Sequence, residues 1–312
     1  MKQLSLHITD LCNEKCGFCV VGSPLAKSDS VVYSDLVRFL VQNADEGFES
    51  VNLHGGEPTI HPRLFELLNL IKMLEYPQTH IQTNARRLKN LEFTEKLAAH
   101  GVTLCIVSMH GATASIQDCL TQTPGGFKET IEGIRNARKA GMAVSTNTVL
   151  TRMNMGQLEN LCRLCLDMGV ERINISNLHP VGSGYYALDM QAPTVAETKQ
   201  YLLPVLDLVT KYPVKITLEG FPLCLVHPYE QLAIEDGTRF IRMMYRGGVS
   251  DSYDDYMAEV HREYGPPCEG CALRPACTGV YHEYAERRGW DGFGLETAPA
   301  GPAVPAGQTA AV

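Results

Sequence analysis

Three cysteines near the amino end of the sequence are spaced as ligands of a metal cluster. Cys12, Cys16 and Cys19 form a C-x3-C-x2-C pattern. Thiolates this close together can bind one iron–sulfur cluster. Three protein ligands leave one iron atom of such a cluster open, and an open coordination site is what substrate or cofactor chemistry needs. Zinc binding or simple burial of the thiols is the alternative interpretation.

A glycine-rich motif follows the second predicted strand. It consists of Gly55, Gly56, Glu57 and Pro58. Two glycines allow the backbone to approach a ligand closely, and the Glu57 carboxylate can accept hydrogen bonds from an ammonium group. Taken alone, the motif would be an ordinary turn. Its position behind a strand, shortly after the cysteines, favours a binding function.

Single polar residues stand at or near the ends of later strands. Asn84 follows the third predicted strand, Ser108 closes the fourth, and Asn147 lies in the fifth. We expect these side chains to line the same site, with hydrogen bonding inside the barrel as the alternative. His110 and Asp118 are candidate substrate contacts, and loop capping explains them equally well.

A second group of cysteines lies near the carboxyl end. Cys268, Cys271 and Cys277 follow a Pro-Pro pair, and Cys224 lies upstream. Together they could supply four thiolates, either to a second cluster or to a zinc knuckle. If Cys224 is not a ligand, a cluster held by the other three would have an open iron. Cys119 stands apart, in the loop expected after the fourth strand, where a thiol could donate a hydrogen atom.

The elements that position these residues alternate between strand and helix patterns up to about residue 220. The predicted strands are 4–8, 51–53, 80–83, 104–108, 143–150, 172–176 and 214–218. Such alternation indicates a parallel sheet with right-handed crossovers. We predict an α/β fold, a partial (β/α)6 barrel, with its active site at the carboxyl ends of the strands.

Regular periodicity fades after Phe221, and the domain organisation follows from that change. We expect the barrel over 1–220, a small cysteine-rich domain over 221–296, and a disordered tail over 297–312, which is rich in Ala, Pro and Gly. Cys162 and Cys165 lie in a predicted helix beside leucines, so we expect them in the core.

Net charge, apolar runs and cysteine content indicate which partners and which cellular compartment to expect. The 312 residues carry a formal net charge of −8, which favours neither nucleic acid nor an anionic membrane as partner. No apolar run reaches the roughly 18 residues of a membrane helix, and no secretion signal is visible. Eleven cysteines at short spacings point to metal ligation in a reducing compartment. We therefore expect a cytoplasmic protein.

The first cysteine cluster resembles the signature of the radical S-adenosylmethionine (SAM) superfamily, with Phe18 at the aromatic position before the last cysteine. The resemblance implies a [4Fe–4S] cluster whose open iron chelates SAM. Reduction would then release a 5′-deoxyadenosyl radical that abstracts hydrogen. Gly55–Pro58 match the family's GGEP motif, which contacts the amino group of SAM, and Asn84 and Ser108 match polar positions that line its ribose and carboxylate. Asn147 is grouped with them as a polar residue that can point into the barrel.

The carboxyl-terminal cysteines resemble the short "twitch" form of the SPASM extension. That resemblance implies one auxiliary [4Fe–4S] cluster on Cys224, Cys268, Cys271 and Cys277. The spacing departs from full SPASM, which carries more cysteines and usually two clusters. A flavodoxin or ferredoxin is the electron donor that the family implies.

The resemblance leaves the net reaction open. The first expectation is dehydrogenation or epimerisation of a sugar-like or other natural-product molecule, with Cys119 as hydrogen donor in the epimerising case. The alternative is a maturase that modifies a ribosomally made peptide. The first strand is expected near residue 4, which leaves no space before it for a leader-binding domain and favours the small molecule. A non-catalytic iron–sulfur scaffold or electron carrier is the third possibility.

Overall fold

The computed structural model describes residues 2–233, 240–246 and 248–295. Its centre is a nine-stranded sheet in the order β7-β6-β5-β4-β3-β2-β1-β8-β9. The strands of the sheet are β1 Lys2–Thr9, β2 Ser50–Gly55, β3 Gln78–Thr83, β4 Val102–Ser108, β5 Ala143–Leu150, β6 Arg172–Asn177, β7 Lys215–Glu219, β8 Phe240–Tyr245 and β9 Gly248–Ser250. Neighbouring strands from β8 through β1 to β7 are parallel, and β9 pairs antiparallel with β8. The predicted α/β barrel is confirmed.

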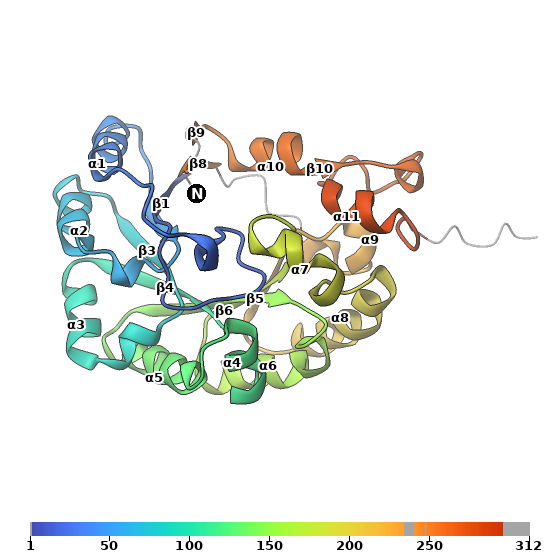
Figure 1. Cartoon of the computed structure of the whole chain (residues 1–312), viewed down its shortest axis with the longest axis horizontal. Helices are drawn as coiled ribbons and strands as arrows, with labels where there is room; N and C mark the ends of the chain where they lie inside the picture. The colour runs from blue at the N-terminus through green and yellow to red at the C-terminus, as the bar shows by residue number, and fades with distance from the viewer. Residues whose placement is uncertain (1, 234–239, 247, 296–312) are drawn as a thin grey trace, which may run out of the picture.

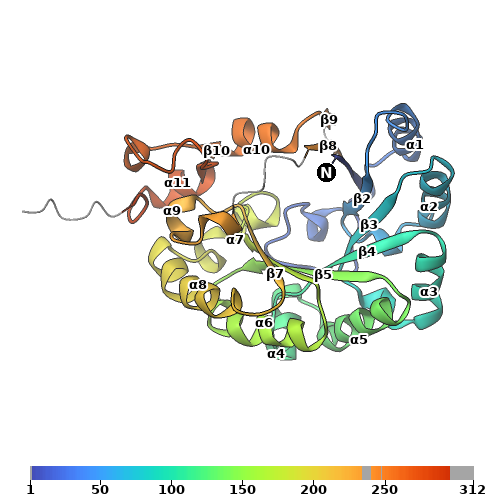
Figure 2. The ribbon, with the colours of Figure 1, turned by 180° about the vertical axis from the view of Figure 1, so that it is seen from behind.

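The helices are α1 Tyr33–Gln42, α2 Leu64–Met73, α3 Leu91–Ala99, α4 Ala114–Thr121, α5 Gly126–Lys139, α6 Leu158–Asp167, α7 Ser183–Gln191, α8 Val195–Val209, α9 Leu223–Val226, α10 Tyr253–His261 and α11 His282–Arg288. Figures 1 and 2 show α1, α2, α3, α5, α6 and α8 on the outer side of the curved sheet, whereas α10 and α11 lie across its open side. The capping box between Thr194 and Glu197 fixes the start of α8. Cys162 and Cys165 are fully buried on α6, which confirms their expected place in the core.

Side-chain alternation in β1 separates the core from the barrel interior. Leu4, Leu6 and Ile8 are fully buried in the main hydrophobic cluster. The residues between them, including Ser5 and His7, line a cavity inside the barrel. Successive side chains of a strand point to opposite faces, so one face of β1 packs against helices and the other faces the cavity.

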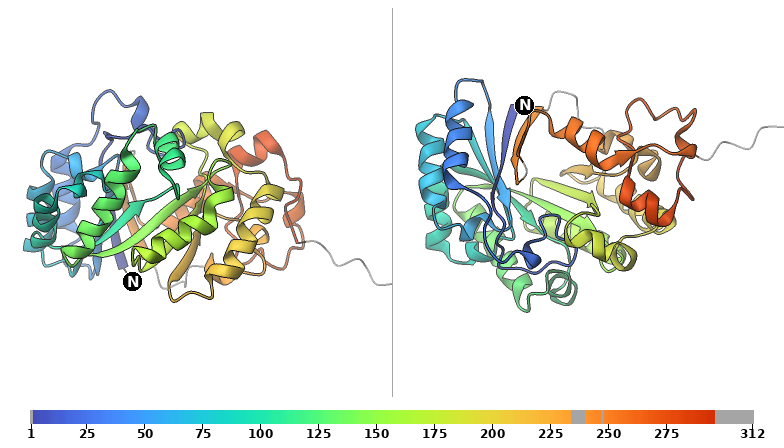
Figure 3. Two further views of the ribbon diagram at one scale, coloured as in Figure 1. Left: turned by 90° about the horizontal axis from the view of Figure 1, so that it is seen from below. Right: turned by 45° about the horizontal axis from the view of Figure 1, so that its top comes forward.

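The segment after residue 220 contributes two strands to the main sheet and also forms a small separate strand pair. β8 pairs with β1 over Lys2–Leu6, so it extends the sheet at the edge opposite β7. Figure 3 shows this orange strand beside the blue β1. A short antiparallel pair follows, β10 Arg262–Glu263 with β11 Val280–Tyr281. The domain boundary at residue 221 stays a prediction. The sequence pattern did not reveal that β8 and β9, which lie beyond this boundary, join the main sheet. The tail expected over 297–312 lies outside the described residues.

Among the described residues, no helix is both long and apolar enough to cross a membrane.

Candidate active site

The first cysteine cluster lies in the loop that leaves the carboxyl end of β1. All three thiols are free and partly buried. A turn joins the backbone N–H of Cys19 to the carbonyl of Cys16 at 3.3 Å, and Lys15 N–H donates to the Thr121 carbonyl at the end of α4 at 3.0 Å. The loop is therefore folded on itself and tied to the neighbouring helix.

A buried carboxylate fixes the start of this loop to its far end. Asp10 has no exposed surface, and its Oδ2 accepts a hydrogen bond from the backbone N–H of Ser30 at 2.9 Å. In return, the Asp10 N–H donates to Asp29 Oδ1 at 3.1 Å. Burial alone would raise the pKa of Asp10, but hydrogen bonds from Ser30 and His7 outweigh it, so the pKa is lowered. Asp10 is therefore an ionised anchor.

The GGEP motif attaches the end of β2 to the same loop. Gly56 N–H donates to the Thr9 carbonyl at 2.6 Å, and Glu57 N–H donates to the Leu11 carbonyl at 2.7 Å. A Cβ on Gly56 would lie 2.0 Å from the Leu11 oxygen, closer than any side chain permits. Gly55 has φ 137°, a conformation that favours glycine. The two glycines thus serve backbone contact between β2 and the cysteine loop.

The Glu57 carboxylate is fully buried and receives protein donors on both oxygens. Oε1 accepts from the N–H and hydroxyl of Thr59, at 3.0 and 2.6 Å, and from the Thr83 hydroxyl at 2.7 Å. Oε2 accepts from the Asn84 N–H at 2.7 Å. Burial raises the pKa of Glu57, and these hydrogen bonds oppose the rise. The carboxylate joins β2 to β3; contact of Glu57 and of the buried Pro58 with SAM stays a prediction.

Asn84 reaches the cysteine loop directly. Its Nδ2 donates to Asn13 Oδ1 at 2.6 Å and lies 3.9 Å from the Cys12 sulfur. Ser108 and Asn147 pair in register across β4 and β5. Of these two, only Asn147 lines the barrel cavity. The structure therefore brings Asn84 beside the cluster cysteines and places Asn147 deeper in the barrel.

The cysteine loop supplies three free, partly buried thiols that could hold an iron–sulfur cluster. Burial raises the pKa of Cys12 to about 12, and the charges of Glu57 and Glu14 add to the rise. Thiols must lose their protons to bind metal, so a cationic centre would reverse this shift.

A cavity of about 680 Å³ occupies the barrel interior below the cysteine loop. Amide and hydroxyl side chains on β5, β6 and β7 form one wall. Asn174 Nδ2 donates to Asn147 Oδ1 at 2.9 Å and to Glu219 Oε2 at 3.0 Å. The Thr217 hydroxyl donates to Asn174 Oδ1 at 2.8 Å, and the Ser176 hydroxyl donates to Asn147 Oδ1 at 2.6 Å. This wall is a continuous polar network.

Aromatic side chains form another part of the cavity lining, the aromatic wall, and most of them come from the segment after residue 220. Its members are Tyr245, Tyr253, Tyr256, His261 and Tyr281. His179, which follows β6, stacks on Tyr281 with ring centroids 4.5 Å apart and meets His261 edge-on at 4.7 Å. Burial, with the charges of His261 and Arg262, lowers the pKa of His179 to about 3. The wall therefore carries neutral rings.

Asn147 was predicted from the sequence as an inward-pointing residue, but the other members of the polar network and the aromatic wall were not. The signal was available in the strand sequences. Polar residues alternate with apolar ones at Ser5 and His7, at Asn174 and Ser176, and at Thr217. Inward-facing polar residues on neighbouring parallel strands indicate a solvated barrel interior.

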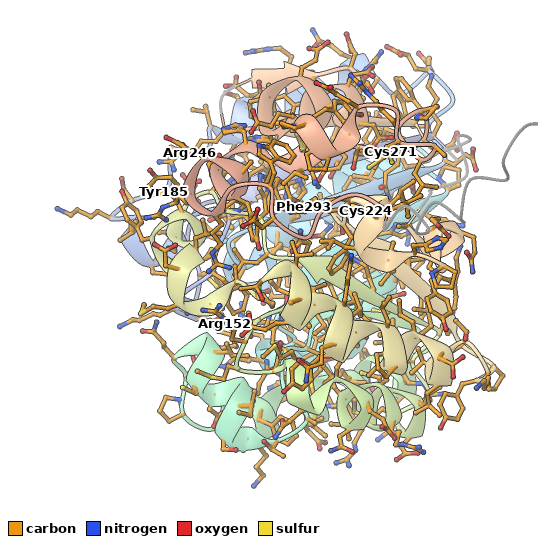
Figure 4. The ribbon with its side chains drawn as sticks, turned by 90° about the vertical axis from the view of Figure 1, so that its right-hand side faces the viewer. Arg152, Tyr185, Cys224, Arg246, Cys271 and Phe293 are labelled. Atoms are coloured by element: carbon orange, nitrogen blue, oxygen red, sulfur yellow. The ribbon has the colours of Figure 1, made fainter. Side chains whose placement is uncertain are left out.

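The carboxyl-terminal cysteines lie together, away from the first loop. Burial raises the pKa of Cys224 on α9, and the nearby charges of Cys277 and Cys268 contribute to the rise. Cys277 Sγ accepts hydrogen bonds from the N–H groups of Leu223 and Gly279, both at 3.4 Å. Cys271 N–H donates to the Cys268 carbonyl at 3.3 Å. Figure 4 shows Cys224 and Cys271 on one face of the molecule.

The remaining candidates lie outside the cavity. Cys119 is exposed on α4, so the expected loop position was wrong: residues 114–121 form a helix that packs beside the cysteine loop. Asp118 accepts from the N–H groups of Gly125 and Phe127, at 2.6 and 2.7 Å, which is the capping role. His110 is buried, and its Nδ1 accepts from the Val149 N–H at 3.2 Å.

Comparison with known proteins agrees with this geometry. Over 205 residues the chain is 31% identical to a probable GTP 3′,8-cyclase of Saccharolobus islandicus, covering 65% of each chain. The match therefore spans less than two thirds of that relative. SuiB of Streptococcus suis bound to SAM superposes with TM-score 0.65 at 20% identity, covering 91% of this chain and 74% of that one. SuiB has also been solved with precursor peptide SuiA, at the same TM-score and identity, covering 91% and 72%.

A further solved structure, native anSMEcpe with AdoMet and the Cp18Cys peptide, superposes with TM-score 0.64 at 16% identity, covering 94% of this chain and 92% of that one. At these identities the solved structures establish the fold alone. The family model described as the radical SAM superfamily matches residues 6–165, which is more than half of the chain. The chain belongs to the radical SAM superfamily, whose members imply a [4Fe–4S] cluster and SAM.

Proposed function

We propose that this radical SAM enzyme abstracts hydrogen from a small, hydroxyl-rich molecule and so dehydrogenates or epimerises it. The observation that carries the proposal is the cavity of about 680 Å³ inside the barrel. Ligand sites for small molecules generally occupy about 300–1,000 Å³. The cavity is large enough for a sugar-sized molecule beside a second ligand, and it begins at the loop that carries the cluster cysteines.

The two walls of the cavity support a hydroxylated ring as substrate. The network of Asn147, Asn174 and Glu219 offers amide donors and carboxylate acceptors at short spacing. Such groups can exchange hydrogen bonds with neighbouring hydroxyls of a ring. The aromatic wall around Tyr281 offers a flat apolar surface on which a ring can lie. Polar side chains and aromatic rings that line one cavity would therefore orient such a molecule.

The cluster and SAM, not a side chain of the protein, would supply the radical that starts the reaction. A [4Fe–4S] cluster with SAM supplies the 5′-deoxyadenosyl radical when it is bound. Cys12, Cys16 and Cys19 would hold that cluster, and Gly55, Gly56, Glu57, Pro58, Asn84, Ser108 and Asn147 are the proposed SAM contacts. Asn84 is the best supported of these, since its side chain already contacts the cysteine loop.

We further propose a second [4Fe–4S] cluster in a twitch-like segment. The charges of Cys277 and Cys268 contribute to the raised pKa of Cys224, and the Cys271 N–H donates a hydrogen bond to the Cys268 carbonyl. An auxiliary cluster suits an oxidation because it can accept the electron left on a substrate radical. A zinc knuckle remains the competing assignment. A flavodoxin or ferredoxin would be the electron donor for the first cluster.

A peptide maturase is the second candidate, and a surface next to the cavity favours it. Tyr186 and Met190 on α7 are 73% and 74% exposed. A depression of about 530 Å³ lies between α7 and loop 21–26, and it shares Val21, Gly182 and Arg246 with the cavity. Figure 4 shows Tyr185 and Arg246 at this edge. The solved SuiB and anSMEcpe structures hold peptides, which adds weight to this candidate.

The two candidates can be separated by a substrate panel under anaerobic conditions. The reconstituted protein, SAM and a reductant are mixed with aminocyclitols, hexoses, GTP, or short peptides rich in Ser and Cys. Substrate-dependent 5′-deoxyadenosine and a product two mass units lighter, obtained with a cyclitol or hexose, support dehydrogenation. Incorporation of one deuterium from D₂O with no other mass change indicates epimerisation. Turnover of peptides or GTP alone would overturn the small-sugar proposal.

A further inference from the structure

A histidine and a carboxylate form a hydrogen-bonded pair where the cavity meets the cysteine loop. His7 lines the cavity from β1, and its Nε2 lies 2.9 Å from Asp10 Oδ1. Asp10 is held in turn by the N–H of Ser30 at 2.9 Å, and the Arg246 guanidinium lies 3.7 Å from its Oδ2. The imidazole therefore has a fixed orientation, set by a carboxylate that the fold itself anchors.

The pairing determines which ring nitrogen is available for chemistry. Nε2 of His7 faces Asp10 Oδ1 at 2.9 Å, and that oxygen can accept its hydrogen. Nδ1 is then the ring nitrogen left to accept a proton. A base oriented by a carboxylate through its other nitrogen is the arrangement that general-base catalysis uses.

Neighbouring groups border the His7 ring where it lines the cavity. A Cβ on Gly55 would lie 3.4 Å from Cε1 of His7, so glycine at this position leaves the ring edge uncrowded. His54 meets His7 edge-on, with ring centroids 5.7 Å apart. Burial, with the charge of His7, lowers the pKa of His54 to about 3, so His54 stays neutral beside it. Arg246 is the cation on this side, and it faces Asp10.

We propose that His7 is the general base that takes the proton of a substrate hydroxyl, which makes the net reaction a dehydrogenation. This inference rests on the proposed function. The carbinol hydrogen atom leaves to the 5′-deoxyadenosyl radical, and His7 Nδ1 accepts the hydroxyl proton. The remaining electron passes to a one-electron oxidant of the iron–sulfur class. The C–H and O–H bonds break, a C=O bond forms, and the substrate loses two hydrogens in total.

The contents of the cavity favour this reaction over epimerisation. An epimerase must return a hydrogen atom to the substrate radical, and a thiol is the usual group for that step. Among the described residues that line the cavity there is no cysteine, and Cys119 is exposed on α4. A dehydrogenase instead needs a base beside the radical site, and the His7–Asp10 pair occupies that position.

The first test needs no substrate. Imidazole nitrogens are observed by NMR in the reconstituted full-length protein labelled with 15N-histidine, with His7 assigned by its loss in His7→Gln. We expect hydrogen on Nε2 and an unprotonated Nδ1 at pH 8. Hydrogen on Nδ1 would overturn the proposal, whatever the substrate is, because the base would then lack its lone pair.

The second test uses the active molecule from the substrate panel. In His7→Gln, oxidised product per 5′-deoxyadenosine formed should fall about 100-fold or more. His7→Ala should regain at least tenfold of its product when imidazole is added. His100→Gln, at the C-cap of α3, should match wild type. Unchanged product per 5′-deoxyadenosine in His7→Gln, or loss without imidazole rescue, would refute the role of His7.

The two proposals fail separately. If no small molecule in the panel reacts, the proposed function is wrong, and the NMR measurement still decides the protonation of His7. If a cyclitol or hexose reacts but His7 is dispensable, only the base is wrong.

Discussion

At the scale of single residues, side chains near the cysteine loop form hydrogen bonds that join separate segments of the chain. Glu57 is the clearest case. The sequence motif predicts a SAM ligand, whereas the structure gives its carboxylate four hydrogen bonds from Thr59, Thr83 and Asn84. No sequence pattern reveals such partners, because Thr83 ends another strand, β3, and Asn84 follows it. Asn84 then continues the connection to Asn13.

Replacement of Glu57 by Gln should destabilise the barrel. One oxygen becomes an NH₂ group that faces hydrogen-bond donors, so at least one buried donor loses its acceptor. We expect a loss of roughly 1–3 kcal/mol in the free energy of unfolding, together with lower iron incorporation. Denaturant unfolding and iron analysis measure both. Glu92→Gln, in the first turn of α3, is the control and should behave as wild type. An unchanged unfolding midpoint in Glu57→Gln would contradict the assigned role.

His110 should make stability depend on pH. Burial lowers the pKa of His110 to about 4, whereas the unfolded chain has a value near 6.5. Below pH 6.5 the unfolded chain binds a proton that the folded protein excludes, so stability falls as pH decreases from 6.5 toward 4. The loss approaches about 1.4 kcal/mol per pH unit for one such group. His110→Gln should reduce the slope of unfolding free energy against pH between pH 7 and 5. Parallel slopes for wild type and His110→Gln would show that burial does not govern this group.

At the scale of elements, the contact between β2 and the cysteine loop is the critical one. Gly56 and Glu57 each donate a backbone hydrogen bond to that loop, at 2.6 and 2.7 Å. The sequence predicted the strand and the loop, because periodicity and glycine pairs are local signals. Their contact depends on the parallel order of β1 and β2, which the alternation of strands and helices implied but could not place at the level of atoms.

Gly56→Ala tests this contact. The added methyl group would meet the Leu11 carbonyl, so the cysteine loop must move away from β2. We expect a severalfold loss of iron bound per chain after anaerobic reconstitution, with the helical circular-dichroism signal retained. Gly156→Ala has open space around its methyl group and provides the matched control. Full iron content in Gly56→Ala would mean that the loop tolerates displacement.

At the scale of the whole molecule, the carboxyl-terminal segment completes the barrel. β8 pairs with β1, while α10 and β11 supply most of the aromatic wall of the cavity. Arg262 connects β7 to β11 through carbonyls of Gly220 and Gly279, both at 3.1 Å. The sequence predicted seven strands and a cysteine-rich extension. It did not predict β8 or β11, because pairs made far along the chain leave no local periodicity.

The auxiliary cluster has a separate test. Cys271→Ala should bind about four fewer iron atoms per chain while still cleaving some SAM, and product formation should be lost. The first loop would keep its own cluster, so 5′-deoxyadenosine should still form without coupling to substrate. Cys119→Ala, exposed on α4, should keep full iron content. Full product turnover by Cys271→Ala would exclude a role for that thiol in the reaction.

The most direct measurement is iron and SAM cleavage in one preparation. The protein is reconstituted anaerobically, its iron is counted, and dithionite with SAM is added, for wild type and Cys12→Ala. The account predicts about eight irons and 5′-deoxyadenosine in wild type, and about four irons with no 5′-deoxyadenosine in Cys12→Ala. A wild-type protein that binds iron but forms no 5′-deoxyadenosine with any reductant or panel substrate would contradict the assignment of radical SAM activity.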